Sequence, residues 1–259
     1  MKNSTIVVSL IIALGFLISC SKADSEVMGK NSPDGKSGST ARITIKGDYL
    51  YAVDNSSLKV VNISDPSNPT YIGTEEIGFG IETIYPFKDY LFIGSNIGMY
   101  IYGLTDPAHP KRLSEFQHIT ACDPVIANDT LAFITLRNNN ICNRWTDTRE
   151  IDVVNIKDIM NPFMETIYYT QGYPHGLDML DTLLFVCQGT NGVVVYDINK
   201  IMQGQGNAKV SSITGFDLNV FDAIIWQNKL FVIGESGFYQ FDYTDIHNIK
   251  LISSILTGQ

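Results

Sequence analysis

Short apolar stretches rich in β-branched residues, separated by polar turns, run through most of the chain. The clearest is Leu58–Ile63, which ends in a Ser-Asp-Pro-Ser-Asn-Pro turn at residues 64–69. Asp65 can accept a hydrogen bond from the backbone that follows it, while Pro66 fixes its own φ angle and lacks an N–H donor. A strand that enters this turn must therefore end there. Residues 105–110 repeat the same punctuation.

Five units of this kind follow one another along the chain. In each unit a polar turn precedes a leucine that begins an apolar strand, and these leucines are Leu50, Leu91, Leu131, Leu183 and Leu230. Their spacings of 41, 40, 52 and 47 residues, with four short strands per unit, are typical of β-propeller blades. The sequence predicts an all-β fold, a five-bladed β-propeller of four-stranded antiparallel blades. The expected blades are about 41–78, 79–118, 119–170, 171–214 and 215–259.

Other architectures fit the pattern less well. A β-sandwich does not repeat one punctuated unit five times, and no window has the 3.6-residue apolar spacing of a helical solenoid. Unit 1 begins with its innermost strand, Arg42–Lys46, and unit 5 ends with its outermost strand, Lys250–Ile255. We therefore expect that no blade combines strands from the N-terminal and C-terminal ends of the chain. We expect the ring to close by side-chain packing between blades 5 and 1.

The first forty residues differ from the rest. Lys2 precedes an apolar run from Ile6 to Ile18 that is too short to cross a bilayer comfortably, and Ser19-Cys20 follows. This arrangement resembles the lipobox of bacterial lipoproteins, which implies removal of residues 1–19 and a lipid on Cys20. Ser21, in place of an aspartate, implies sorting to the outer membrane by the same resemblance, with the body facing the periplasm or the surface. An ordinary secretory signal with a chance cysteine is the alternative.

Composition adds two expectations. Residues 20–40 contain mostly Ser, Gly, Lys, Asp and Asn, so we expect a flexible tether between Cys20 and the propeller at 41–259. The net charge of −9 argues against nucleic acid as a partner, because nucleic-acid binding requires basic patches. The chain has 13 Tyr and 13 Phe with 17% charged residues, as expected of a well-filled β-rich body.

The strand and turn at residues 58–69 resemble the LVIVD repeat of exported bacterial β-propeller proteins. The resemblance extends over about residues 41–258 and is strongest in the first two units. It implies a propeller scaffold on an exported protein, mostly without assigned biochemistry. It brings no catalytic residues.

A polar residue stands eight positions before each aligned leucine, and this column contains Arg42, Thr83, Asp123, His175 and Asp222. In a propeller it would ring one mouth of the central channel, where a ligand site is expected. Gln188 and Glu235 should approach the same rim. The alternative is that polar residues simply occur where strands meet water. One histidine and two carboxylates from three different units have no metal-site spacing, so neither a metal nor a cofactor is predicted.

Three cysteines remain after Cys20. Cys122 and Cys142 flank the strands of the third unit on one expected rim, and the exported compartment permits a disulfide between them. Two unrelated thiols are the alternative, and Cys187 lies within an apolar strand as an expected buried thiol. Tyr168, Tyr169 and Tyr173 form either a sugar-stacking surface or blade-to-blade packing. The Asp-Thr pairs at 129–130 and 181–182 resemble O-glycosylation acceptors of Bacteroidetes-type bacteria, although turn chemistry alone explains them.

The function predicted from these features is binding. The chain lacks Gly-x-Ser-x-Gly, a phosphate-binding loop, His-Glu-x-x-His and Cys-x-x-Cys. We expect a lipid-anchored, non-enzymatic scaffold of the cell envelope for a protein, peptide or glycan. The alternative is a hydrolase or lyase on glycan or peptide that uses Asp123, His175 and Asp222 as acid and base groups. A purely structural envelope component is a third possibility.

Overall fold

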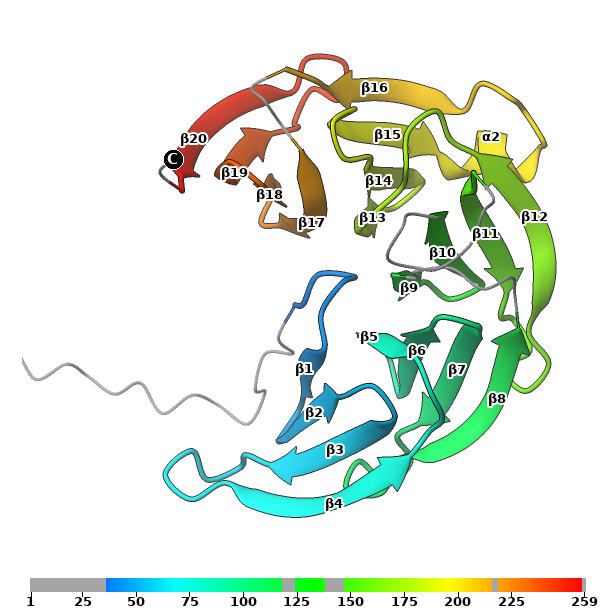
Figure 1. Ribbon diagram of the computed structural model, residues 1–259, viewed down its shortest axis with the longest axis vertical. Helices are drawn as coiled ribbons and strands as arrows, with labels where there is room; N and C mark the ends of the chain where they lie inside the picture. The colour runs from blue at the N-terminus through cyan, green and yellow to red at the C-terminus, as the bar shows by residue number, and fades with distance from the viewer. Residues whose placement is uncertain (1–35, 118–123, 138–146, 216–218, 258–259) are drawn as a thin grey trace, which may run out of the picture. The chain divides into compact units, whose positions relative to one another are not determined.

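The computed structural model describes residues 36–117, 124–137, 147–215 and 219–257. Residues 34–259 form one compact unit, and within it the described strands make five four-stranded antiparallel sheets arranged as the blades of a propeller (Figure 1). The predicted fold class is therefore confirmed. No helix among the described residues is long and apolar enough to span a membrane.

Each blade uses four consecutive strands, from the innermost to the outermost. Blades 1 and 2 contain β1 (Ile43–Lys46), β2 (Tyr49–Val53), β3 (Ser57–Asn62), β4 (Thr70–Glu76), β5 (Ile81–Phe87), β6 (Tyr90–Ser95), β7 (Gly98–Gly103) and β8 (Lys111–Gln117). Blades 3 and 4 contain β9 (Val125–Ala127), β10 (Leu131–Arg137), β11 (Arg149–Asn155), β12 (Phe163–Tyr169), β13 (Leu177–Leu180), β14 (Leu183–Cys187), β15 (Val193–Asp197) and β16 (Lys209–Ile213). A short helix, α2 (Ile198–Met202), precedes β16. Blade 5 contains β17 (Val220–Trp226), β18 (Lys229–Gly234), β19 (Gly237–Asp242) and β20 (Lys250–Leu256).

A β-bulge recurs between the third and fourth strands of every blade. On the third strand, the residue that follows the bulge pairs with one residue of the second strand. In blades 1 to 5 this partner is Leu50, Leu91, Ala132, Leu184 and Leu230, respectively. Leu131 and Leu183 therefore lie one position earlier than the other three aligned leucines. The alignment by leucine is therefore wrong in blades 3 and 4. There Ala132 and Leu184 occupy the ladder position that an aligned leucine occupies in the other three blades.

The corrected register reveals an aromatic residue at one position in all five blades: Tyr51, Phe92, Phe133, Phe185 and Phe231. The first four are fully buried, each in the apolar cluster that its blade shares with the next. Large aromatic side chains at one repeated position hold consecutive blades together through buried area.

Blades 5 and 1 do not share such a cluster. The described residues form four apolar clusters, which join blades 1–2, 2–3, 3–4 and 4–5. Phe231 is only partly buried, while Ile233, Phe238 and Ile255 are exposed in one cross-strand row of blade 5. Ile43 of β1 is also exposed. Figure 1 shows these two sheets standing apart, whereas the innermost strands of consecutive blades are in contact.

The expectation that packing between blades 5 and 1 closes the ring is therefore wrong. Phe133 and Phe185 are buried against the following blade. Phe231 occupies the same register position, but no sheet stands beside that face of blade 5. Strand sharing does not close the ring either, since every sheet uses only its own four strands.

Candidate functional site

The predicted channel-mouth column contains residues at two different register positions. Arg42, Thr83 and Asp222 are equivalent, but His175 lies one position early in blade 4, where Gly176 occupies the matching place. Pro124 is the matching residue in blade 3, and Asp123 lies outside the described residues. The column is therefore not polar in every blade.

Asp222 is enclosed by hydrogen bonds from within the protein. Its carboxylate accepts bonds from Ser39 Oγ at 3.2 Å, from Thr40 N at 3.2 Å and from Thr40 Oγ1 at 2.6 Å. A fourth bond comes from its neighbour Ala223 N at 3.0 Å. Burial raises the pKa of Asp222, and the hydrogen bonds partly oppose that rise.

The backbone crowds this carboxylate closely. A Cβ atom added at Gly176 would lie 2.0 Å from Asp222 Oδ1, and one added at Gly38 would lie 2.1 Å from Oδ2. Only glycine therefore fits at either position without a shift. The candidate ligand group at residue 222 already has partners inside the protein.

The residues that enclose Asp222 belong to a segment, Lys36–Thr40, that we call the anchor segment. Lys36 Nζ lies 2.6 Å from Asp178 Oδ2, which also accepts a bond from Ile225 N at 2.6 Å. Lys36 donates to Ile225 O at 2.5 Å, and Leu177 N donates to Ser39 Oγ at 2.7 Å. The end of the expected flexible tether is thus bound to the innermost strands of blades 4 and 5.

His175 is partly buried beside Phe221, with their ring centroids 6.1 Å apart. Burial, followed by the charge of Arg137, lowers the pKa of His175 to about 4. The imidazole is therefore neutral near pH 7. The backbone carbonyl of His175 accepts a bond from Thr135 Oγ1 at 2.6 Å, which joins blades 3 and 4.

The remaining rim candidates do not converge on one site. Arg42 and Glu235 are exposed, and Glu235 Oε2 accepts a bond from Asn219 Nδ2 at 3.0 Å. Thr83 is buried. Among the residues that the structure describes, no group of three or more His, Cys, Asp or Glu side chains is arranged to hold a metal ion.

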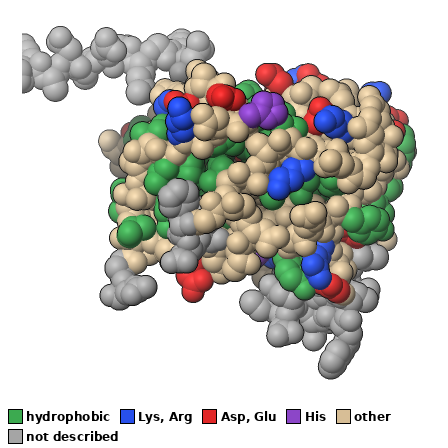
Figure 2. Space-filling model, turned by 90° about the horizontal axis from the view of Figure 1, so that it is seen from above, with side chains coloured by type: hydrophobic (Ala, Val, Ile, Leu, Met, Phe, Trp, Pro, Cys, Tyr) green, Lys and Arg blue, Asp and Glu red, His purple; other side chains and the backbone are tan. Residues whose placement is uncertain are grey.

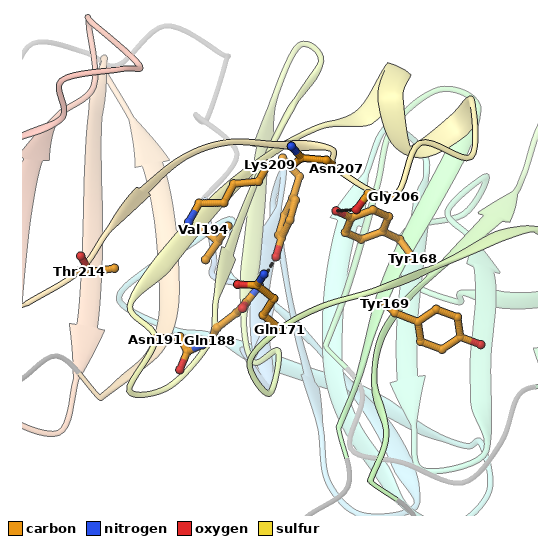
Figure 3. Close-up of a pocket in the computed structure, with 11 residues that line it drawn as sticks. Tyr168, Tyr169, Gln171, Gln188, Asn191, Val194, Gly206, Asn207, Lys209 and Thr214 are labelled. Carbon is orange, nitrogen blue, oxygen red and sulfur yellow. Dashed lines mark hydrogen bonds between the residues drawn. The ribbon is translucent and has the colours of Figure 1, made fainter.

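Gln188 lines a pocket between the outer parts of blades 3 and 4 (Figure 3). The cavity measures about 260 Å³, slightly below the usual range for small-molecule sites. Its lining consists of Tyr168, Tyr169, Gln171, Gln188, Asn191, Val194, Tyr196, Gly206, Asn207, Lys209 and Thr214. We call this the tyrosine–amide pocket. Its lining includes no carboxylate and no imidazole.

A hydrogen-bonded pair forms the wall of the tyrosine–amide pocket in blade 4. Gln188 Nε2 donates to Tyr196 Oη at 2.6 Å, and Gln188 Oε1 accepts from Gly172 N at 3.0 Å. Burial raises the pKa of Tyr196 to about 12, so the phenol keeps its proton. Both ends of the Gln188 amide are held, which makes this wall rigid.

Tyr168 lines the pocket from β12 and lies against Tyr196. Its ring meets the Tyr196 ring edge-on, with centroids 5.2 Å apart, and its Oη accepts a bond from Ala208 N at 3.2 Å. Tyr169 is the next residue on the strand and points away from this group in Figure 3. It therefore offers an exposed ring at the edge of the pocket.

A cation–π cluster supports the backbone beside this pocket. The Arg149 guanidinium lies 4.7 Å from the centroid of the Tyr173 ring and donates to Gln171 O at 3.0 Å. Tyr173 Oη donates to Asp147 Oδ1 at 2.7 Å, and Asp147 also pairs with Arg149. Arg149 and then Tyr173 lower the pKa of Asp147 to about 2.

Sequence reasoning identified part of this pocket. The sequence predicts Tyr168, Tyr169 and Tyr173 as either a sugar-stacking surface or blade-to-blade packing, and it places Gln188 at the channel rim. Asn207 and Lys209 were missed, because they follow a Gly/Gln-rich loop that departs from the repeat. Cys187 is a buried free thiol, as predicted. Cys20, Cys122, Cys142 and the proposed Cys122–Cys142 disulfide lie outside the described residues.

The fold and the five matched registers define a five-bladed β-propeller with a polar pocket between two blades. Residues 37–75 match the model of the LVIVD repeat. The chain is therefore a propeller that carries an LVIVD repeat in its first blade, in agreement with the resemblance of its strand-and-turn unit. A search of curated proteins finds no match to the sequence.

Solved structures share this fold at low sequence identity. A functionally unknown protein from Desulfotomaculum acetoxidans is 12% identical, with a TM-score of 0.65 over 84% of this chain and 70% of its own. The designed protein Ika8 is 11% identical, with a TM-score of 0.58 over 82% and 60%. BamB from Moraxella catarrhalis is 9% identical, with a TM-score of 0.57 over 79% and 57%. The chain thus spans only about 60% of Ika8, and these similarities show the fold alone.

Proposed function

We propose that the protein is a non-enzymatic binding scaffold of the bacterial cell envelope that holds a glycan in the tyrosine–amide pocket. A lipid on Cys20 would hold it at the outer membrane, as the lipobox-like residues 17–20 suggest. The LVIVD match supports export, because the repeat resembles those of exported propellers. The observation that carries the proposal is the lining of the pocket.

The chemistry of the lining suits a sugar. The exposed ring of Tyr169 offers an apolar face to the C–H surface of a sugar ring. Amide side chains such as Gln171, Asn191 and Asn207 provide donors and acceptors for sugar hydroxyls. Lys209 is a cation within the same lining and could pair with the carboxylate of an acidic sugar.

Of the three residues of the hydrolase alternative, Asp123 lies outside the described residues, and the positions of His175 and Asp222 give it no support. Acid–base cleavage of a glycosidic bond uses two carboxyl groups beside the substrate, whereas the tyrosine–amide pocket is lined by neither Asp nor Glu. Asp222 is occupied by the anchor segment, and His175 is outside the pocket lining. Binding is therefore the function that the geometry favours.

A titration tests this function directly. The full chain would be titrated with a neutral oligosaccharide and with its uronic-acid counterpart, and binding would be followed by calorimetry. We expect saturable binding. Lys209→Ala should lower the affinity for the acidic probe roughly tenfold, which is the effect of losing one charge-assisted hydrogen bond. Asn207→Ala should lower the affinity for both probes.

Lys200→Ala is the matched control, because Lys200 lies on α2 outside the pocket lining. This variant should bind both sugars as the unmodified protein does. Equal affinities in the Lys209→Ala and Lys200→Ala variants, or no binding of either sugar, would refute the glycan proposal.

A further inference from the structure

Blade 3 carries two buried carboxylates on the face that it turns toward blade 2. Glu150 and Asp152 of β11 lie directly opposite Leu136 and Ile134 of β10, so the four side chains share one face of the sheet. Leu136 and Ile134 belong to the apolar cluster between blades 2 and 3. Glu150 is only 8% exposed and Asp152 only 2%. Two ionisable groups therefore lie at an apolar interface between blades.

The other blades carry different residue types at these two positions. The position of Asp152 is occupied in blades 2, 4 and 5 by a side chain that is buried against the preceding blade, and these residues are Tyr100, Val194 and Tyr239. The position of Glu150 is occupied in blades 2 and 5 by Gly98 and Gly237. Blade 1 has Ser57 and Lys59 there, on a face that has no sheet beside it. Among blades 2 to 5, the acidic pair thus replaces packing residues only in blade 3.

The surroundings of Asp152 do not explain this replacement. Within the described part of the chain, Asp152 Oδ1 has no hydrogen-bond partner. Burial, and then the charge of Glu150, raises the pKa of Asp152, so the two carboxylates are near enough to repel each other. A buried carboxylate without a partner costs stability, whereas an apolar side chain at this position would contribute to it. A cation held by both carboxylates removes the repulsion and gives the buried charge a partner.

We propose that Glu150 and Asp152 bind a calcium ion between blades 2 and 3. The two ionised carboxylates carry two negative charges, which one divalent cation neutralises. Carboxylate oxygens are preferred ligands of calcium, and each carboxylate can bind through one oxygen or both. Water completes the set of roughly six to eight oxygen ligands that calcium takes.

Calcium suits this pair better than other divalent ions. Zinc favours nitrogen and sulfur ligands, while magnesium requires nearly regular octahedral geometry and loses its water reluctantly. Glu150 and Asp152 have fixed backbone positions, because both are paired with β10 and β12. An ion that accepts irregular sets of oxygen ligands therefore fits them best. This inference is independent of the glycan proposal, because the tyrosine–amide pocket lies between blades 3 and 4.

Calorimetric titration with calcium chloride tests the site. The full-length chain would first be treated with EDTA and then titrated at about pH 8, where carboxyl groups are free to release their protons to a metal. We expect saturable binding of calcium and much weaker binding of magnesium. Asp152→Asn and Glu150→Gln should each lower the affinity for calcium by at least roughly a hundredfold, because changes around the ligands alone cost about 10–100-fold.

Glu165→Gln is the matched control, because it removes an exposed carboxylate from β12 of the same blade. Figure 2 shows Asp and Glu side chains at the surface, and the control tests whether such exposed carboxylates account for the binding. It should bind calcium as the unmodified chain does. No binding by the unmodified chain, or equal affinities in Asp152→Asn and Glu165→Gln, would overturn the proposal. Magnesium that binds as tightly as calcium would overturn the choice of ion.

Thermal unfolding separates the loss of binding from a loss of folding. Saturating calcium should raise the Tm of the unmodified chain and of Glu165→Gln, because an ion that binds only the folded state stabilises it. Asp152→Asn and Glu150→Gln should unfold cooperatively in EDTA, since each replaces a buried charge by a neutral amide, and calcium should leave their Tm unchanged. A calcium-dependent rise in Tm in these two variants as large as that of the unmodified chain would also overturn the proposal.

Discussion

Asp152 shows how one buried residue can set the pH response of the protein. It lies on β11 between Ile151 and Val153 and is only 2% exposed. Within the described part of the chain, its Oδ1 has no hydrogen-bond partner. Burial, and then the nearby charge of Glu150, raises the pKa of Asp152 to about 7. The ionised form is therefore disfavoured in the folded protein.

The pKa of Asp152 predicts a loss of stability with rising pH. The carboxyl group has an ordinary value of 3.8 when unfolded and about 7 when folded, so its contribution is full below about pH 4. That contribution declines as the pH rises toward 7, by up to about 4 kcal/mol between these two pKa values. Asp152→Asn should therefore show a flatter dependence of the free energy of unfolding on pH. Urea unfolding of both proteins at about pH 5 and about pH 8 measures the difference.

The comparison between the two proteins isolates this residue from the others. Carboxyl groups with lowered pKa values, such as those of Asp54 and Asp147, act in the opposite direction but are common to both proteins. Parallel pH profiles for Asp152→Asn and the unmodified chain would contradict the assignment.

At the scale of the element, the second strand of each blade carries the residue that holds the next blade. Phe133 on β10 and Phe185 on β14 are fully buried in the clusters with the following blade. Phe231 on β18 occupies the same register position but is only partly buried. Equivalent positions in equivalent strands therefore differ only in whether a neighbouring sheet stands beside them.

This difference predicts unequal effects for one substitution. Phe133→Ala should reduce the free energy of unfolding by about 3–5 kcal/mol, because it leaves a cavity in a packed cluster. Phe231→Ala should cost roughly 1 kcal/mol, since its ring buries less area against other side chains. Urea denaturation of the two variants measures the contrast. Equal losses would show that blade 5 packs against another sheet in solution.

At the scale of the whole described unit, the anchor segment joins the chain before blade 1 to blades 4 and 5. Its contacts are polar: Ser39 and Thr40 donate to Asp222, and Lys36 pairs with Asp178. Blades 5 and 1 share no apolar cluster. On this side of the propeller, the polar contacts of the anchor segment hold the chain before blade 1 to blades 4 and 5.

Removing these hydrogen bonds should loosen blades 4 and 5 selectively. Ser39→Ala/Thr40→Ala leaves the buried Asp222 carboxylate short of donors, at an expected cost of roughly 3 kcal/mol. Amide hydrogen exchange should quicken at Leu177, whose N–H donates to Ser39, while Phe92 in blade 2 keeps its rate. Ser37→Ala is the control, because Ser37 contacts Thr44 at 3.4 Å rather than Asp222. Unchanged exchange at Leu177 would contradict this role.

The blade count and strand order could be read from the sequence because their causes are local. Asp65 and Pro66 end a strand by bonds and φ restraints within a few residues, and the device recurs at residues 105–110. Alternating apolar residues between such turns then define short strands. The buried state of Cys187 follows from the same local pattern.

Other features depend on contacts between residues far apart in the chain. The position of Leu183 in its ladder, the enclosure of Asp222 by Ser39 and Thr40, and the approach of Tyr168 to Tyr196 are of this kind. The strand pattern also could not reveal that Phe231 lacks a neighbouring sheet, because its sequence environment matches that of its buried equivalents. Sequence alone determined what each blade is, since turns and alternation act within a few residues. Only the tertiary structure decided what lies beside each blade, because register and packing depend on where distant strands stand.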